Sequence, residues 1–272
     1  MKPASFDYLR VDNVSEAQAL LAEHGADARI LAGGQSLLAV LNMRLAAPRA
    51  LIDISQVREL DYVRVDGNAV AIGAAVTQTS LQAFPGLERI VPLAARVLPS
   101  VAHLQIRNKG TVCGSIAHAD PSAELPLVVI ALGGEVVLGS TRGRRHVPAD
   151  AFFLGMLQTA CAADEMIVEV RLPVAAPGDR HAFHEVSLRQ GDFALVALAA
   201  IASGDRLSLA VGGVADRPVV RHWNGMDDGA IDDALNHFAW SLAAQDDIHA
   251  SARYRRHLVR VLGRRLLTEV RA

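Results

Sequence analysis

The sequence predicts an α+β fold, and three observations lead to this prediction. The first 56 residues alternate short apolar strands with helical patterns. After Leu60 the apolar runs become shorter and are joined by turn signals. After a linker marked by Pro173, Pro177 and Gly178, a run of strand patterns is followed by two helical ones. We therefore expect three domains, at residues 1–56, 57–172 and 178–272.

The composition is that of an ordinary globular protein. Of 272 residues, 51% are hydrophobic and 21% are charged, and the net charge of −2 argues against a nucleic-acid-binding protein. Two cysteines are too few for a disulfide framework or an iron–sulfur cluster, which normally takes about four thiolates. Residues 1–7 lack the apolar core of a signal peptide, and no apolar run is long enough to span a membrane. We expect a soluble cytoplasmic protein.

The first domain is organised around residues 28–38. An apolar strand at 28–31 runs into the turn Gly33-Gly34 and then into a helix at 37–45, which Ser36 is expected to cap. Glycines let a ligand approach the backbone, and amides at the start of a helix stabilise a phosphate. A plain strand-turn-helix corner explains the same residues, and the Gly-x-Gly-x-x-Gly of a Rossmann site is absent.

The remaining elements follow from apolar patterns, prolines and capping residues. The first domain also has an extended entry at 6–10, a helix from about 15 to 24 and a strand at 50–54. In the second domain we expect strands at 62–65, 70–72, 135–138 and 166–172, with helices from Thr77 through Leu81, at 90–97 and at 123–132. In the third we expect strands at 182–188, 193–201 and 207–211, then helices at 231–242 and 251–270.

A second glycine-containing stretch lies at residues 105–126. It contains Arg107-Asn108-Lys109-Gly110-Thr111-Val112-Cys113-Gly114-Ser115 and then Asp120-Pro121. Together with the first glycine turn, it resembles the FAD-binding subunit of the molybdenum hydroxylases, the family of xanthine dehydrogenase and carbon monoxide dehydrogenase. In that family one loop reads Ala-Gly-Gly-Gln/His-Ser-Leu and the other reads Arg-Asn-Arg-Gly-Thr-Ile/Val-Gly-Gly. Cys113 departs from this pattern, because the family usually has glycine there.

The resemblance covers nearly the whole chain and implies a fold and a cofactor site. The fold would be the two-subdomain FAD-binding fold of the vanillyl-alcohol-oxidase (PCMH) type, followed by a C-terminal α+β domain of antiparallel strands and helices. The implied FAD contacts are Ala32, Gly33, Gly34, Gln35, Ser36, Leu37, Thr111, Gly114, Ser115, Asp120, Glu124, Ile167 and Phe193. Because a flavin brings its own redox chemistry, no catalytic side chain is assigned.

Two acidic residues in the second stretch have several possible roles. Asp120 and Glu124 are four residues apart, which places them on one helix face if the segment is helical. Such a pair suits a general acid and base, or a charge pair at a helix N-terminus. The resemblance implies a third role, in which Glu124 accepts hydrogen bonds from the adenosine ribose hydroxyls.

Residues 184–194 resemble the family segment that lies near the flavin ring. Phe193 stands where relatives have an aromatic ring close to the isoalloxazine, although core packing is an equal alternative. Glu185 stands where the usual residue is lysine. A lysine would stabilise the reduced anionic flavin and a glutamate would oppose it, so this position bears on the flavin potential.

Other patterns give no second site. The ten histidines are scattered, and no cluster supplies three or four ligands, so we expect no metal. Residues 253–267 are basic and amphipathic. Such a helix commonly packs its leucines inward and solvates its arginines, and it is also compatible with a membrane surface, RNA or a partner subunit.

The resemblance implies an FAD-carrying electron-transfer subunit of a heterotrimeric molybdenum hydroxylase. A large partner would hold the molybdenum cofactor and oxidise an N-heteroaromatic, an aldehyde, a purine or carbon monoxide. A small partner would carry two 2Fe–2S clusters, and the complex would be a dimer of heterotrimers. Two alternatives remain open: a self-sufficient single-chain flavin oxidase or reductase, and a non-catalytic nucleotide-binding assembly module.

Overall fold

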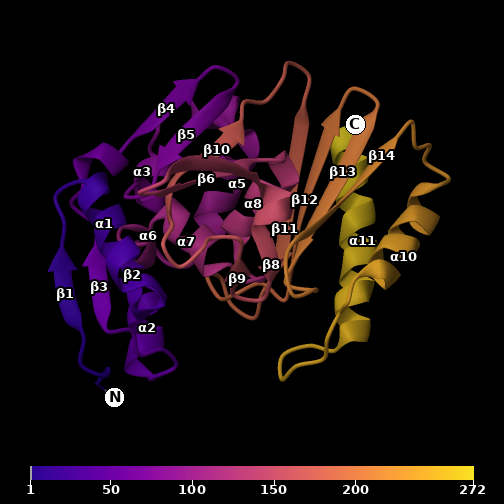
Figure 1. Ribbon diagram of the computed structural model, residues 1–272. Coiled ribbons are helices and arrows are strands. Elements are labelled where there is room, and N and C mark those ends of the chain that lie inside the picture. The colour runs from indigo at the N-terminus through magenta and orange to yellow at the C-terminus, as the bar shows by residue number, and fades with distance from the viewer. Residues whose placement is uncertain (1) are drawn as a thin grey trace.

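The computed structural model describes residues 2–272, in which three main sheets follow one another along the chain (Figure 1). The first sheet has three parallel strands in the order β1-β3-β2. Its elements are β1 Asp7–Arg10, α1 Val14–His24, β2 Ala28–Leu31, α2 Leu37–Asn42 and β3 Ala50–Asp53. The predicted strand-helix-strand pattern is confirmed. The helix predicted at 37–45 ends earlier, because Arg44 takes a left-handed φ of 56°.

The second sheet is antiparallel, in the order β4-β5-β10-β6-β7. Its strands are β4 Val63–Asp66, β5 Ala69–Gly73, β6 Glu135–Ser140, β7 Gly143–Pro148 and β10 Met166–Pro173. The four predicted strands are confirmed. β7 was missed because it lies at the edge and is mostly exposed, so its polar sequence carries no apolar alternation.

Short helices pack beside the second sheet. They are α3 Gln78–Gln82, α4 Leu87–Ile90, α5 Pro92–Val97, α6 Leu104–Arg107, α7 Val112–His118, α8 Glu124–Leu132 and α9 Ala149–Phe152, followed by the hairpin β8 Phe153–Gly155 and β9 Gln158–Thr159. The cap at Thr77 is confirmed, since its side chain accepts a hydrogen bond from the Ser80 amide. The helix predicted at 90–97 is confirmed over Pro92–Val97, but it begins two residues later than predicted. A separate short helix, α4, ends before Val91, whose backbone is not helical because Pro92 disfavours the α region for the residue before it.

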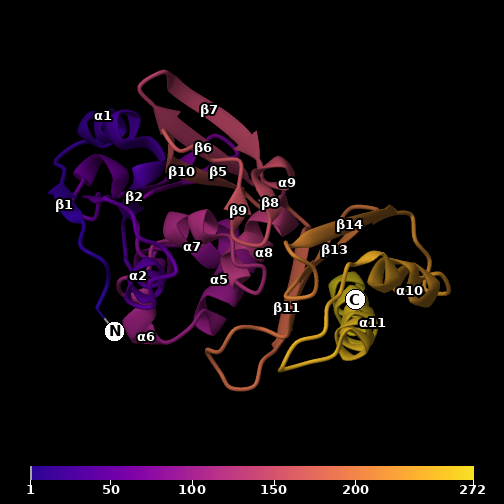
Figure 2. The ribbon, with the colours of Figure 1, turned by 60° about the horizontal axis from the view of Figure 1, so that its bottom comes forward.

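The third sheet is an antiparallel meander of β11 Arg180–Val186, β12 Val196–Ser203, β13 Arg206–Gly212 and β14 Val219–Asn224. Helices α10 Ile231–Ser241 and α11 Ala252–Arg271 lie together on one face (Figures 1 and 2), and α8 contacts β12 and β13 from the other. The predicted strands and both helices are confirmed. β14 was missed, and it is again a half-exposed edge strand.

Helix α8 connects the second and third sheets. All its residues except Leu132 are buried, and it contacts β10, β12, β13 and α5. A helix that is apolar on all sides belongs in the interior. Its first residue, Glu124, is thereby carried to the centre of the molecule.

The basic C-terminal helix packs as an amphipathic helix. Val259, Leu266 and Leu267 of α11 are buried against the third sheet. On its outer side, Arg264 forms an ion pair with Asp232 and Arg271 forms one with Asp228. The inward packing of the leucines is confirmed. Within residues 2–272, none of the helices combines the length and apolar character needed to cross a membrane.

Candidate cofactor-binding site

The two glycine loops meet in the structure. A Cβ atom on Gly33 would lie 2.1 Å from the carbonyl oxygen of Lys109 and 2.8 Å from the Cα atom of Gly110, so only glycine fits there. Gly34 has a φ of +71°, which L-residues rarely adopt. The Gln35 side-chain amide donates to the Gly33 carbonyl over 3.0 Å. The second loop therefore crosses directly over the backbone of the first.

The first loop presents backbone amides at the start of α2. The amide of Leu38 donates to the carbonyl of Gly34 over 3.0 Å and begins the helical hydrogen bonding. The amides of Gln35, Ser36 and Leu37 precede it, where helices leave N–H groups without an internal acceptor. The predicted cap at Ser36 is wrong, because its backbone is already helical and its side chain makes no capping bond. Gln35 and Ser36 are exposed, so a ligand can reach them.

The second loop is the first turn of a helix rather than an open loop. Thr111 caps α7, and its hydroxyl accepts a hydrogen bond from the Gly114 amide over 3.0 Å. A Cβ on Gly114 would lie 2.6 Å from that hydroxyl, which explains the glycine. Ser115 is half-buried in the same turn.

The departure at Cys113 causes no backbone strain. Cys113 lies inside α7 with an ordinary φ and is buried, and its thiol is 3.5 Å from the carbonyl oxygen of Ile72. Burial raises the pKa of this thiol far above its usual value, so it stays protonated. The position needs a small buried side chain and not the conformational freedom of glycine.

Gln78 lies beside the joined loops, and sequence reasoning missed it. The backbone amide of Gln78 donates to the carbonyl of Gly110 over 2.9 Å, and the residue is 5% exposed. Its Oε1 atom is buried without a hydrogen-bond partner among the described residues. Buried acceptors in native proteins are normally paired, so this oxygen fits a donor supplied by a ligand. The one sequence signal was the polar residue directly after the capping Thr77.

The acidic residues predicted on one helix face are arranged differently. Glu124 begins α8 and is buried, whereas Asp120 lies in the preceding turn, where it accepts a hydrogen bond from the Ser122 amide over 2.8 Å. The prediction that Asp120 and Glu124 lie on one helix face is therefore wrong. Burial raises the pKa of Glu124 to about 7, and the charges of Glu185 and Asp120 act in the same direction. The Glu124 carboxyl can accept hydrogen bonds from ligand hydroxyls in either protonation state.

The segment after β11 brings the third sheet against the second domain. Gly191 has a φ of +86°, and a Cβ there would lie 2.8 Å from the His103 ring. Phe193 is 62% exposed, so core packing of its ring is excluded. Glu185 is half-buried, one of its carboxylate oxygens has no partner among the described residues, and burial raises its pKa.

The structure brings the two glycine loops together at Gly33 and Gly110, and the other expected contact residues differ in their burial. Ala32 and Leu37 are half-buried on either side of the first glycine turn. Ile167 is buried on β10, opposite Leu138 of β6, with its side chain in the core. A contact from Ile167 to a ligand would therefore have to involve its backbone. No group of three metal-binding side chains occurs anywhere in the described chain.

These features fit FAD. The backbone amides of the first loop suit a pyrophosphate, the buried Gln78 oxygen and the Glu124 carboxyl suit ribityl and ribose hydroxyls, and the exposed Phe193 ring suits a flat aromatic system. The fold and the site together define a flavin-nucleotide-binding protein with a separate C-terminal domain.

Comparison with known proteins identifies the family. Residues 4–175 match the model described as the FAD binding domain in molybdopterin dehydrogenase, and residues 181–270 match the CO dehydrogenase flavoprotein C-terminal domain. The chain is 37% identical to the nicotine 6-hydroxylase medium subunit of Paenarthrobacter nicotinovorans, covering 100% of this chain and 99% of that one. It is 36% identical to the 6-hydroxypseudooxynicotine dehydrogenase complex subunit alpha of the same organism, covering 99% and 95%.

A solved structure supports the same assignment. The carbon monoxide dehydrogenase from Hydrogenophaga pseudoflava has a chain with a TM-score of 0.93 and 33% identity, covering 99% of this chain and 98% of that one. The chain belongs to the family of FAD-binding medium subunits of molybdenum hydroxylases. It is the flavoprotein subunit of an oxidoreductase.

Proposed function

We propose that this subunit receives electrons from iron–sulfur clusters on a partner chain and passes them through FAD to an external acceptor. The contact of Gly33 with Lys109 and Gly110 carries this proposal, because it builds one cradle from two loops that both match the family. The two cysteines support the division of labour: Cys113 is buried in a helix and no cysteine cluster exists in residues 2–272. Bound FAD would supply the redox chemistry, and this chain would bind and orient it.

The proposed FAD contacts remain those predicted from the sequence, with one addition. The loops at Ala32 to Leu37 and at Thr111, Gly114 and Ser115 would hold the pyrophosphate. Asp120, Glu124 and the backbone of Ile167 would lie along the nucleotide, and Phe193 would face the flavin ring. Gln78 joins this set, because its buried Oε1 lacks a partner among the described residues.

The proposed complex has a large chain with the molybdenum cofactor and a small chain with two 2Fe–2S clusters, assembled as a dimer of heterotrimers in the cytoplasm. Medium-subunit relatives of nearly the same length support these partners. The substrate is oxidised on the large chain and belongs to the N-heteroaromatics, aldehydes, purines or carbon monoxide. The three-domain division at 1–56, 57–172 and 178–272 is part of the proposal and is supported by one main sheet in each range, with the small β8-β9 hairpin as an addition in the second.

Native purification tests this function. The protein is isolated from its source, co-purifying chains are identified by mass spectrometry, and visible spectra are recorded before and after dithionite. We expect bleaching flavin bands, two companion chains, molybdenum and iron. A lone yellow chain that turns over a substrate would establish the single-chain flavoenzyme instead. Bound FAD that no substrate of the complex reduces would indicate the assembly module.

A further inference from the structure

One arginine of the basic C-terminal helix is buried. Arg255, in the first turn of α11, is 5% exposed and is the only buried arginine in residues 2–272. A buried guanidinium is unfavourable unless hydrogen bonds and an opposite charge compensate for its lost hydration. The contacts of this side chain therefore show what it holds in place.

Arg255 binds the ends of two strands and one carboxylate. Its Nη1 donates to the carbonyl oxygen of Leu195 over 2.8 Å and also to the carbonyl oxygen of Gly213. Its Nη2 donates to Asp247 over 2.5 Å. Leu195 lies just before β12 and Gly213 just after β13, so one side chain joins both strands where they approach the second domain.

The same two strand ends lead to the proposed cofactor contacts. Leu195 follows Phe193 by two residues. Gly213 donates its amide to the carbonyl of Pro121 over 2.7 Å, and Pro121 follows Asp120. Gly213 has a φ of +76°, and a Cβ there would lie 2.8 Å from the carbonyl oxygen of Ala194. The backbone at this junction is close-packed, so a shift at one strand end is transmitted to the other.

The apolar contacts that dock α11 come from residues other than Arg255. Further along the helix, Val259, Leu266 and Leu267 are buried against the third sheet and supply the apolar contacts. Arg255 lies in the first turn of the helix, one turn before Val259, and contacts the backbone at Leu195 and Gly213. Its position suits a role in setting backbone geometry there.

We infer that Arg255 is a positioning residue for FAD: through the carbonyls of Leu195 and Gly213, it holds the Phe193 segment and the Asp120-Pro121 turn against the cofactor. This inference rests on the proposed contacts of Phe193 and Asp120. The hydrogen bonds of the guanidinium all go to this chain, at Leu195, Gly213 and Asp247. Removing the guanidinium lets both segments shift. This shift alters the surroundings of the flavin ring and lowers the affinity of the chain for FAD.

The test uses the purified full chain loaded with FAD. Arg255→Met removes the donors, Arg255→Lys keeps a charge with fewer directed bonds, and Arg260→Met, on the exposed face of the same helix, is the matched control. We expect Arg255→Met to weaken FAD binding by about tenfold, the loss of charge-assisted hydrogen bonds, and to shift the visible spectrum of the bound flavin. The FAD affinity and flavin spectrum of Arg255→Lys should lie between those of Arg255→Met and the unaltered chain. Arg260→Met should match the unaltered chain in both.

A double-mutant cycle separates positioning from simple loss of stability. If Arg255 acts through the aromatic segment, its effect on the flavin spectrum should disappear in a Phe193→Ala background. Asp247→Asn keeps an acceptor for the His249 and Ala250 amides and weakens only the ion pair with Arg255. If Arg255→Met fails to fold, the FAD affinity and flavin spectrum of Asp247→Asn test the inference. Variants with unchanged FAD affinity and spectrum would overturn the inference. An unaltered chain that binds no FAD would instead overturn the proposed function.

Discussion

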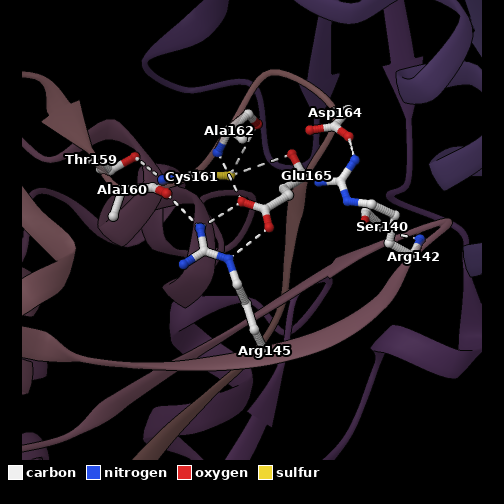
Figure 3. A network of polar contacts seen from close by, with 9 residues as sticks. All are labelled: Ser140, Arg142, Arg145, Thr159, Ala160, Cys161, Ala162, Asp164 and Glu165. Carbon is white, nitrogen blue, oxygen red and sulfur yellow. Dashed lines mark hydrogen bonds and ion pairs between the residues drawn. The ribbon is translucent and has the colours of Figure 1, made fainter.

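Two polar regions of the molecule differ in how completely the polar groups of the chain pair with one another. In the cluster around Arg145 and Glu165, the Arg145 guanidinium donates to both Glu165 carboxylate oxygens over 2.7 Å (Figure 3). It also donates to the Ala160 carbonyl, and Glu165 accepts from the Ala162 amide over 2.9 Å. This bidentate arrangement fixes the chain beyond β9 without any external group.

The glycine loops show the opposite arrangement. Gln78 has a buried oxygen without a partner among the described residues, and Gln35 and Ser36 are exposed directly before α2. Elsewhere in the proposed site, Glu124 is a buried carboxyl with a raised pKa. Polar groups completed within the chain stabilise the fold, whereas polar groups left incomplete at a close-packed junction are available to a ligand. Substitutions in the first region should change stability alone, and substitutions in the second should change FAD binding.

The largest expected effect is that of Gly33→Ala. The new Cβ would overlap the Lys109 carbonyl, so the loops must separate, at a cost of about 3 kcal/mol. FAD affinity should fall by about a hundredfold, because the two halves of the cradle no longer meet. Titration of the purified chain with FAD, followed by flavin fluorescence, measures this. Gly229→Ala is the control, since its Cβ would meet only ordinary contacts. Equal affinity of both variants would refute the joined cradle.

Breaking the Arg145 cluster should affect stability only. Glu165→Gln removes the charge that faces a half-exposed guanidinium, so we expect about 2 kcal/mol of lost stability, below the value for a fully buried pair. Urea unfolding of the FAD-free chain gives this number, and FAD titration should show unchanged affinity. The neighbouring exposed pair offers a control, Asp164→Asn, which should leave the unfolding midpoint unaltered. A fall in FAD affinity with Glu165→Gln would contradict the comparison.

Gln78 should show opposite effects on stability and binding. Gln78→Met keeps the shape and removes the unpaired oxygen, so the FAD-free chain should unfold at equal or higher urea concentration. FAD binding should weaken by about 1 kcal/mol, the contribution of one hydrogen bond. Gln82→Met, at an exposed position of the same helix, is the matched control. A destabilised free chain with normal FAD affinity would show that Gln78 is structural.

Glu124 should make the stability of the FAD-free chain depend on pH. Its pKa is about 7 in the folded chain and near 4.5 when unfolded, so the folded state binds more protons between these values. Stability therefore falls as pH rises through this window, by about 1 kcal/mol between pH 6 and pH 7. Urea unfolding across this range should show the slope, which Glu124→Gln removes and Glu88→Gln, at an exposed carboxylate, retains. A slope that persists in Glu124→Gln would assign it to another group.

The sequence predicted features that depend on neighbours in the chain. Gly33 and Gly34 stand between an apolar strand and a helical pattern, so the turn was visible locally. Gln78 was not predicted, because its significance depends on a contact with Gly110 from a distant segment. The burial of Arg255 was not predicted, because the helix contains many other arginines. The helical period alone does not distinguish a buried arginine at the border of the apolar face from an exposed one. Edge strands β7 and β14 lacked alternation because they are largely exposed.

The contact between Gly33 and the Lys109 carbonyl also bears on how the protein folds. It joins the first glycine turn to the turn between α6 and α7, which is distant in the sequence. The contact therefore closes a long loop of chain and forms slowly compared with local helices and turns. Partly folded chains that lack this contact present only half a cradle. Capture of FAD thus reports the completion of tertiary structure, and quenching of flavin fluorescence during refolding should follow, not precede, the recovery of helical circular dichroism.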